Sequence, residues 1–466
     1  MRRQSNGPFP FGPGCMVMTA QHFIFAAAIL LGTAPAAAQT VLTLPDALRL
    51  AAQSSFSADA ARLDLSMARE ETARVKSSYY PQITLDGGHL NLDNQPYFVS
   101  GPIVFPSANQ TSWEYKIAAR ELLWDGGRRS TAMAASRTRE SAVELKGGSD
   151  VRRAQAAVAE RYVTLLSLRG QREVVDQRKK ALSDYLRVVK DLFEQGMTAR
   201  NDLLRTEVAL RSVGDQATAL DNAAATTSEA LNKDLGLDPT APQALPDGLP
   251  PPPSVPWNEG ACRTRAVDQN DGVRALTQKV KALDQAVELK RRDYYPNIVA
   301  EVSHSYQQND YLLYPHVNAL FLGLSLDVFD GGARAAQVRE ARDEADKARR
   351  ELEEAKRGVS LAVGQALRDY DEALREVETA RANVAASEEN LRIIQDQYKE
   401  GLARTTDVLD AESVLAESRW RVVHMHYQAY ARQAALLAAM GEDLVAFYET
   451  GLAAPFPQQQ EKPNGR

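Results

Sequence analysis

The sequence predicts an α+β membrane protein made mostly of long α-helices, with four strands and an internal duplication. Two stretches of 67 residues, 128–194 and 333–399, contain no proline. At about 1.5 Å per residue, each stretch could span about 100 Å as a single helix. Helices of this length are rare in globular domains and typical of coiled coils and helical barrels. Segments in which apolar and polar residues alternate precede both stretches, and short motifs recur at a constant spacing.

Composition excludes several classes of protein. With 55 Lys and Arg against 61 Asp and Glu, the net charge of −6 argues against a nucleic-acid-binding surface. Cys15 and Cys262 are too few for a disulfide framework or a Cys-built zinc site. The chain lacks the phosphate-binding patterns G-x-G-x-x-G and G-x-x-x-x-G-K-[ST] and the nucleophile elbow G-x-S-x-G. We therefore expect no enzyme, with no catalytic, cofactor-binding or metal-binding residue.

Residues 1–38 are predicted to be a signal peptide. An apolar run at 23–31 is followed by small residues and a cleavage position after Ala38. Cys15 precedes the run, so the mature chain is expected to be unlipidated. No later stretch holds 18 consecutive apolar residues, which argues against a helical membrane protein. Alternating strands leave a weak hydropathy signal, so a membrane β-barrel stays possible.

The chain repeats itself at an offset of 205 residues. Trp124–Gly127 recurs as Phe329–Gly332, and Phe193–Gly196 recurs as Tyr398–Gly401. The motif Tyr-Tyr-Pro at 79–81 recurs at 294–296, an offset of 215 residues. The segment between this motif and the following Asp-Gly-Gly is therefore ten residues longer in the first copy. Repetition at one spacing over more than 100 residues indicates a duplicated structural unit.

We expect five segments in the chain. They are the signal peptide, a first structural repeat at 39–237, a Pro-rich linker at 238–257, a second repeat at 258–452 and a disordered tail at 453–466. Each repeat is predicted to run helix, two strands, long helix and shorter helix. The first helix is expected to begin after Thr43 and to end near Tyr79, because Pro81 disfavours helix before it.

The second long helix has heptad spacing, which is typical of helix pairs. The seam positions are Leu367, Tyr370, Leu374, Val377, Val384, Leu391 and Tyr398. A simple two-stranded coiled coil is an alternative to a helical barrel. In the first long helix, Gly147 and Gly148 are each expected to weaken the helix by about 1 kcal/mol.

The strands suit a lipid-facing wall. Leu320, Leu322 and Leu324 share one face of a strand, and Phe321 and Gly323 lie on the other. Aromatic residues gather at both ends of the strands, as in the interfacial girdles of membrane barrels, although a soluble sandwich is an alternative. Four strands cannot close a barrel, so insertion into lipid would require oligomerisation.

The chain resembles the TolC family of outer-membrane efflux and secretion channels in four features. These are the segment 398–411, its partner at 193–204, the Tyr-Tyr-Pro motifs and the Asp-Gly-Gly turns. This resemblance implies a homotrimer with a 12-stranded transmembrane β-barrel and a trimeric α-helical barrel. It places the protein in the outer membrane of a Gram-negative bacterium, in contact with outer-membrane lipid and extending into the periplasm. The implied partners are a periplasmic adaptor (membrane fusion protein) and an inner-membrane transporter.

The resemblance also implies a gate at the periplasmic tip. By position, Asp202 and Tyr398 match residues that link neighbouring helical hairpins, and Asp407 and Asp410 match acidic rings that narrow the pore. The family's linking arginine falls where this chain has an alanine, and Arg404 at the next position is the candidate replacement. The exposed turns resemble docking sites for the adaptor; their residues are Gly196, Met197, Thr198, Gly401, Leu402 and Ala403.

The sequence thus predicts the outer-membrane channel of a tripartite efflux pump, which conducts substrates passively to the exterior. Two alternatives stay open. One is the exit duct of a type I protein secretion system, and the other is a periplasmic coiled-coil adaptor or structural protein.

Overall fold

The computed structural model describes residues 41–252 and 257–450. The predicted signal peptide and the predicted tail at 453–466 lie outside the described residues, as do residues 253–256 of the linker. Within the described ranges, no helix has the length and hydropathy needed to cross a bilayer.

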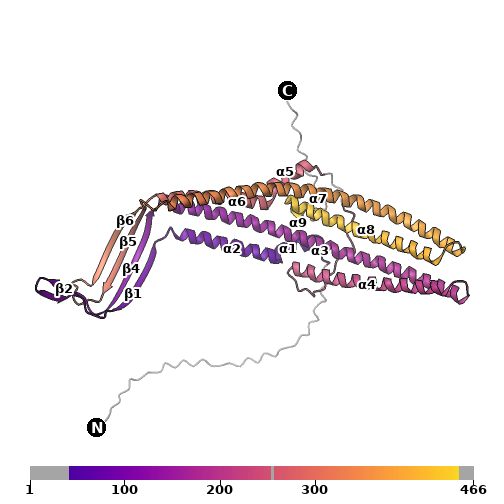
Figure 1. The fold of residues 1–466 in the computed structure, drawn as a ribbon, viewed down its shortest axis with the longest axis horizontal. Coiled ribbons are helices and arrows are strands. Elements are labelled where there is room, and N and C mark those ends of the chain that lie inside the picture. The colour runs from indigo at the N-terminus through magenta and orange to yellow at the C-terminus, as the bar shows by residue number, and fades with distance from the viewer. Residues whose placement is uncertain (1–40, 253–256, 451–466) are drawn as a thin grey trace, which may run out of the picture. The chain divides into compact units, whose positions relative to one another are not determined.

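Helices dominate both copies, and the strands lie together at one end of them (Figure 1). The first copy contains α1 (Leu44–Ser54), α2 (Phe56–Ser77), β1 (Gln82–Asn91), β2 (Tyr97–Ser100), β3 (Ile103–Pro106), β4 (Thr111–Trp124), α3 (Arg128–Glu194) and α4 (Arg200–Asp234). The second copy contains α5 (Glu259–Gln269), α6 (Asp271–Arg291), the 3₁₀ turn η1 (Arg292–Tyr294), β5 (Asn297–Gln307), β6 (His316–Ser325), α7 (Ala333–Lys399), α8 (Thr405–Met440) and α9 (Leu444–Glu449).

The two proline-free stretches form α3 and α7, each a single helix of 67 residues. A short turn connects each long helix to a shorter helix that packs antiparallel to it. The pairs α3/α4 and α7/α8 are thus two matched hairpins that lie side by side (Figure 1). The predicted heptad seam packs between α7 and α8, where Val377 lies in one apolar cluster with Ala429 and Leu391 lies in another with Leu415. The predicted fold class and duplication are therefore confirmed.

The helix predicted to open each copy is in fact two helices. Ser55 has an extended backbone, and its hydroxyl accepts the N–H of Ala58 at 3.2 Å, which caps α2. Asn270 acts likewise in the second copy, because its Oδ1 accepts the N–H groups of Gly272 and Val273 at 2.9 and 3.3 Å. A capping side chain satisfies the first amides of a new helix and so stabilises the break.

The four predicted strands form one antiparallel sheet in the order β1–β4–β5–β6. The edge strands β1 and β6 each pair on one side only within the described chain. The segment that connects β1 to β4 in the sequence forms a separate hairpin of β2 and β3, which the sequence did not predict. This hairpin explains why the first copy is longer between its Tyr-Tyr-Pro and Asp-Gly-Gly motifs.

The main hydrophobic core lies where α1, α3 and α8 meet, around the fully buried side chains of Leu48, Tyr162 and Leu437. Gly147 lies in α3 nearer the sheet. A Cβ on Gly147 would stand 2.9 Å from Cβ of Ala61, so this glycine allows α2 to approach α3 closely. The helix-weakening residue predicted from the sequence is thus a position of close helix contact.

The described part of the linker has no regular secondary structure but is held against α8. The hydroxyl of Tyr430 donates to the carbonyl of Pro250 at 2.7 Å, and Nε2 of His426 lies 3.1 Å from the carbonyl oxygen of Leu249. The extended connector that the sequence predicts is therefore anchored along a helix.

Candidate functional site

The sheet has one apolar face that is open to its surroundings. Residues directly opposite on neighbouring antiparallel strands share a face, so Ile83, Val302 and Leu320 lie together across the sheet. Leu320 is 79% exposed and Ile83 is 71% exposed. The same face carries Leu85, Ile117, Leu322 and Leu324. A contiguous apolar surface of this kind indicates contact with lipid or with another protein.

The opposite face of the sheet is charged. Lys116 lies opposite Asp86 in the register and forms an ion pair with Glu301, with Nζ 2.8 Å from Oε1. Arg120 lies opposite Glu301 on the same face. A sheet with one apolar and one charged face can separate lipid from a water-filled lumen.

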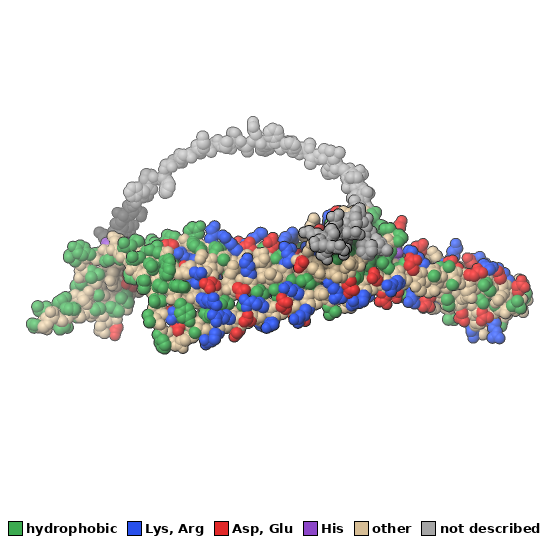
Figure 2. Space-filling model, turned by 90° about the horizontal axis from the view of Figure 1, so that it is seen from above, with side chains coloured by type: hydrophobic (Ala, Val, Ile, Leu, Met, Phe, Trp, Pro, Cys, Tyr) green, Lys and Arg blue, Asp and Glu red, His purple; other side chains and the backbone are tan. Residues whose placement is uncertain are grey.

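Large side chains flank the sheet at both ends. Figure 2 shows hydrophobic side chains gathered over the sheet and its junction with the helices, whereas charged side chains cover the helices. Exposed aromatic residues at the junction are Tyr79, Tyr80, Trp124, Tyr294, Tyr295 and Phe329. Those at the far end are Tyr97, Phe98, Trp113, Tyr311 and Tyr314. This distribution is the one expected of two interfacial girdles.

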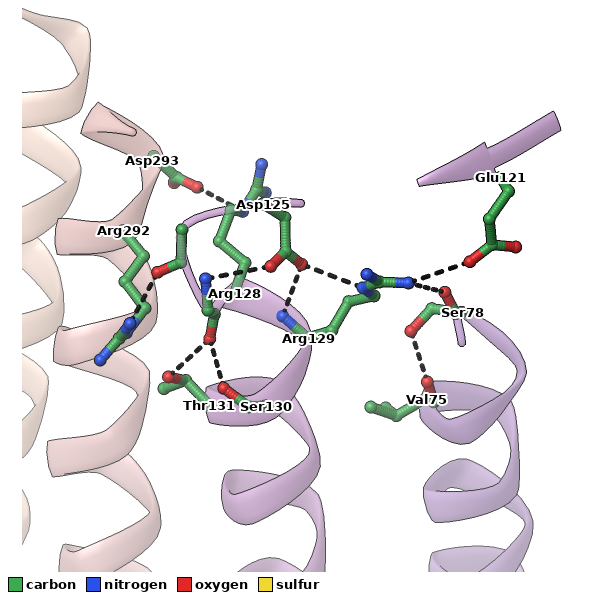
Figure 3. Close-up of polar contacts among 12 residues, drawn as sticks. Val75, Ser78, Glu121, Asp125, Arg128, Arg129, Ser130, Thr131, Arg292 and Asp293 are labelled. Atoms are coloured by element: carbon green, nitrogen blue, oxygen red, sulfur yellow. Dashed lines mark hydrogen bonds and ion pairs between the residues drawn. The ribbon is translucent and has the colours of Figure 1, made fainter. Parts of the chain in front are cut away.

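A polar joint connects the sheet to α3. Asp125, which is 6% exposed, accepts the N–H of Gly127 at 3.0 Å and the N–H of Arg129 at 2.8 Å (Figure 3). The guanidinium of Arg129 also pairs with Asp125 and donates to the carbonyl of Ser78 at 3.1 Å, at the end of α2. One carboxylate thus caps α3, and one arginine connects three segments.

The joint extends to the second copy. Arg292 donates to the carbonyl of Gly126 at 2.6 Å, and Arg128 pairs with Asp293 at 3.0 Å (Figure 3). The positive φ of 63° at Gly126 and the lack of space beside it favour glycine, because an added Cβ would clash with Tyr295.

The same joint recurs at the start of α7. Asp330 accepts the N–H groups of Gly332 and Arg334 at 3.0 and 2.9 Å, and the Arg334 side chain donates to it at 2.6 Å. These hydrogen bonds lower the pKa of Asp330 to about 2, and the bond from the Arg334 side chain contributes most. The Asp-Gly-Gly motifs are evident in the sequence, whereas the roles of Arg129 and Arg334 are not predicted from it, although the two arginines share the 205-residue offset.

At the other end of the helices, both hairpin turns have the same geometry. Gly196 has a φ of 74°, and its N–H donates to the carbonyl of Phe193 at 2.9 Å. The N–H of Met197 donates to the carbonyl of Leu192 at 2.8 Å. Gly401 repeats this arrangement with the same φ of 74°. This Schellman motif ends each long helix and requires a left-handed residue, which glycine supplies.

The predicted docking residues lie at these turns, and the apolar side chain that follows each glycine projects from it. Met197 is 71% exposed and Leu402 is 78% exposed, whereas Thr198 and Ala403 are half-buried. Each turn therefore presents one exposed apolar side chain.

The predicted gate carboxylates lie in the first turns of the returning helices, and that of Asp407 caps α8. Asp202 lies in the first turn of α4 and accepts from Oγ1 of Thr198 at 3.2 Å. Asp407 lies in the first turn of α8 and accepts the backbone N–H of Arg404 at 2.8 Å. Asp410 is exposed one turn further along α8. A cap and a pore-lining role are compatible, because the carboxylates of both Asp407 and Asp410 are exposed.

An aromatic pair connects the two hairpins at the tip. Tyr398 of α7 lies edge-on to Tyr185 of α3, with ring centroids 5.7 Å apart, and its hydroxyl accepts from Thr405 at 3.4 Å. Burial raises the pKa of Tyr185, and the nearby charge of Asp202 acts in the same direction. The structure thus brings Tyr398 and Asp202 around Tyr185. The repeat does not mark Tyr185, because the second copy has no aromatic residue at the equivalent position.

Arg404 is the N-cap residue of α8, and its side chain is exposed. Within the described chain, its guanidinium forms no ion pair. The role of Arg404 as a gate link between chains stays a prediction.

A buried carboxyl group lies about two turns into α8. Glu412 of α8 is 8% exposed, and burial raises its pKa although Arg178 and Arg419 oppose the shift. Arg178 of α3 donates to Ser413 at 2.8 Å, which holds a cation beside this carboxyl group. Glu412 lies 205 residues after Glu207, which is the offset of the repeat.

In the described residues, no group of three or more His, Cys, Asp and Glu side chains could hold a metal ion.

Comparisons with known proteins agree with this geometry. The family model described as "Outer membrane efflux protein" matches residues 47–237 and 263–442. Outer membrane efflux protein BepC of Brucella suis is 24% identical over 429 residues, which is 90% of each chain. The proteases secretion protein PrtF of Dickeya chrysanthemi is 23% identical over 266 residues, 55% of this chain and 57% of that protein.

The fold is also that of solved outer-membrane proteins. VceC from Vibrio cholerae matches with a TM-score of 0.73 and 17% identity, covering 86% of this chain and 96% of that chain. The family and the fold are those of channels of the Gram-negative outer membrane that extend into the periplasm. The chain therefore belongs to the outer membrane efflux protein family.

Proposed function

We propose that three copies of the chain close one duct through the outer membrane, as the resemblance to the TolC family implies. The observation that carries this proposal is the open sheet with one apolar and one charged face. Its edge strands β1 and β6 leave backbone groups unpaired within one chain, and lipid offers those groups no hydrogen-bond partner. Three copies supply twelve strands, above the roughly eight that the smallest single-chain barrels need.

The paired hairpins α3/α4 and α7/α8 continue this duct through the periplasm. The tip turns support a gate, because Asp407 and Asp410 are exposed and three copies of each would form acidic rings. Such rings concentrate negative potential and favour cations. The contact of Tyr398 with Tyr185 supports a closed tip that is held by contacts between hairpins.

The duct acts with a periplasmic adaptor and an inner-membrane transporter, which supplies the energy. The exposed side chains of Met197 and Leu402 give an adaptor hairpin two equivalent apolar contacts per chain. The substrates we propose are small molecules expelled by a tripartite efflux pump. A second candidate, the exit duct of a protein secretion system, is favoured by the likeness to PrtF, whose name states that it secretes proteases.

Disulfide cross-linking between edge strands tests the closed ring. Ile83→Cys in β1 and Leu322→Cys in β6 place two thiols on the apolar face, where the side chains are 71% and 69% exposed. Leu320→Cys and Leu324→Cys replace Leu322→Cys in turn to scan the register between chains. The native Cys262 is buried and should not react.

Oxidation in outer-membrane fractions should give bands of up to three chains and none longer, because a ring has no free edge. Ile83→Cys combined with Leu402→Cys, at the far end of the helices, is the control and should give no such band. A ladder that extends beyond three chains, or no cross-link at any register, would reject the closed trimer.

A further inference from the structure

The β2–β3 hairpin is an apolar structure that the helical duct does not require. Its ten residues, 97–106, include no charged side chain. Phe98 pairs with Phe105 on one face, where their ring centroids are 5.5 Å apart, and Val99 pairs with Val104 on the other. These four side chains are 45–65% exposed. Both faces of the hairpin are therefore apolar and open within the described chain.

Hydrogen bonds place this hairpin firmly at the end of the sheet. Nε2 of Gln95 donates to the hydroxyl of Tyr311 at 3.1 Å, and Nδ2 of the buried Asn309 donates to the carbonyl of Ser107 at 3.2 Å. The partners Tyr311 and Asn309 belong to the connection between β5 and β6. The base of the hairpin is thus fixed to the neighbouring loop, and Figure 1 shows the hairpin leaving the sheet at an angle to β1 and β4.

That neighbouring loop is apolar as well. Residues 311–314 read Tyr-Leu-Leu-Tyr, and Leu313 and Tyr314 are 82% and 74% exposed. We call the hairpin 97–106 and the segment 311–314 together the apolar loop surface. It adjoins the end of the open sheet face, where the rings of Trp113 and His89 are in tilted contact with centroids 4.5 Å apart. The apolar loop surface therefore continues the apolar face of the sheet beyond the ends of the strands.

We propose that the apolar loop surface lies in the outer leaflet of the outer membrane and contacts lipid at the boundary between headgroups and acyl chains. This inference rests on the proposed function, because it requires the sheet to cross the membrane with the helices in the periplasm. Tyr and Trp side chains favour this boundary, since each combines an apolar ring with one polar group, and the Phe side chains of the hairpin add apolar area. A hairpin without charges would otherwise expose both faces to water.

The depth follows from the backbone of the hairpin. Strands β2 and β3 pair only with each other, so their outer edges keep unpaired N–H and C=O groups within the described chain. These groups are costly in the acyl core but are satisfied by water and headgroups at the interface. The hairpin consequently lies along the interface and does not span the leaflet.

A cap made by three hairpins over the mouth of the duct is the competing arrangement. It would explain an apolar hairpin, but it gives no reason for the exposed Leu313 and Tyr314 above a different pair of strands. Contact with lipid accounts for both loops, because both adjoin the sheet's apolar face.

Site-specific fluorescence distinguishes these arrangements. Val99→Cys is labelled with an environment-sensitive fluorophore in the trimer, which is then reconstituted into vesicles carrying nitroxide quenchers on the headgroup or near the top of the acyl chain. Val104→Cys on the paired strand is a second labelling site. Met197→Cys at the helix tip, also an exposed apolar residue, is the matched control.

The proposal predicts emission shifted to shorter wavelength and quenching by both nitroxide lipids at residues 99 and 104, with neither effect at 197. Quenching at 99 and 104 by aqueous iodide alone would overturn it. Disulfide formation between copies of Val99→Cys, without quenching by lipid, would overturn it in favour of a cap. Measuring the conductance of the same samples separates this proposal from that of the duct. If the samples conduct ions but the hairpin is exposed to water, only the lipid contact is rejected and the duct stands.

Discussion

Asp125→Ala at the sheet–helix joint is expected to destabilise the first turn of α3, so that it unfolds locally more often. The carboxylate accepts two backbone N–H groups at 3.0 and 2.8 Å and pairs with Arg129 at 3.3 Å, while its side chain is 8% exposed. Removing it leaves both amides without an acceptor. Loss of a helix cap costs about 0.5–2 kcal/mol, and hydrogen bonds to charged groups contribute about 1.5–3 kcal/mol each. Because these contributions overlap, we expect about 3 kcal/mol of local stability to be lost.

Hydrogen exchange followed by mass spectrometry on peptides covering residues 121–131 measures this loss. A loss of about 3 kcal/mol corresponds to roughly hundredfold faster exchange, since each 1.4 kcal/mol is a factor of about ten. Asp330→Ala should give a smaller effect at the start of α7, because Asp330 makes the equivalent bonds but is 25% exposed.

Asp346→Ala is the control, because Asp346 is 66% exposed and forms a surface ion pair within α7. Surface pairs contribute about 0–1 kcal/mol, so exchange near residue 346 should change little. Unchanged exchange at residues 127–131 in Asp125→Ala would refute the assignment of this carboxylate as the cap of the joint.

Three further predictions concern the helices. Replacing Asp407 and Asp410 by Ala should reduce cation preference in planar bilayers, and unchanged selectivity would remove both residues from the pore lining. Burial raises the pKa of Glu412 above its ordinary 4.5, so its contribution to stability is fully present below pH 4.5 and is lost as pH rises through the raised pKa. Glu412→Gln should therefore melt higher than the natural chain at neutral pH and depend less on pH, and identical melting profiles would contradict this. Gly358→Ala, with no atom near the new Cβ, should stabilise by up to about 1 kcal/mol, whereas Gly147→Ala should not; equal melting shifts would argue against close contact at Gly147.

The sequence predicted the elements whose signals are repeated or long. The absence of proline over 128–194 and 333–399 matches α3 and α7 residue for residue. The alternation around Leu322 predicted an apolar sheet face. The turns at Gly196 and Gly401 were implied by the family resemblance, and their left-handed backbone agrees with it. These signals are local, because they depend on backbone propensity and on the period of the side chains.

Features that depend on contacts between distant segments were missed. The breaks at Ser55 and Asn270 arise where a polar side chain caps a second helix, and no proline marks either position. The role of Arg129 requires the end of α2 to lie beside β4, which the order of residues does not reveal. Tyr185 and Tyr398 are 213 positions apart, and their contact exists only because the two hairpins pack side by side.

Native mass spectrometry of the protein released from detergent micelles tests the central claim most directly. That claim is that a chain with an open four-stranded sheet becomes a channel only by sharing its edges with identical chains. We predict a dominant species with the mass of three mature chains that resists dissociation until the micelle is stripped. A dominant single chain, folded and stable outside the membrane, would contradict the account.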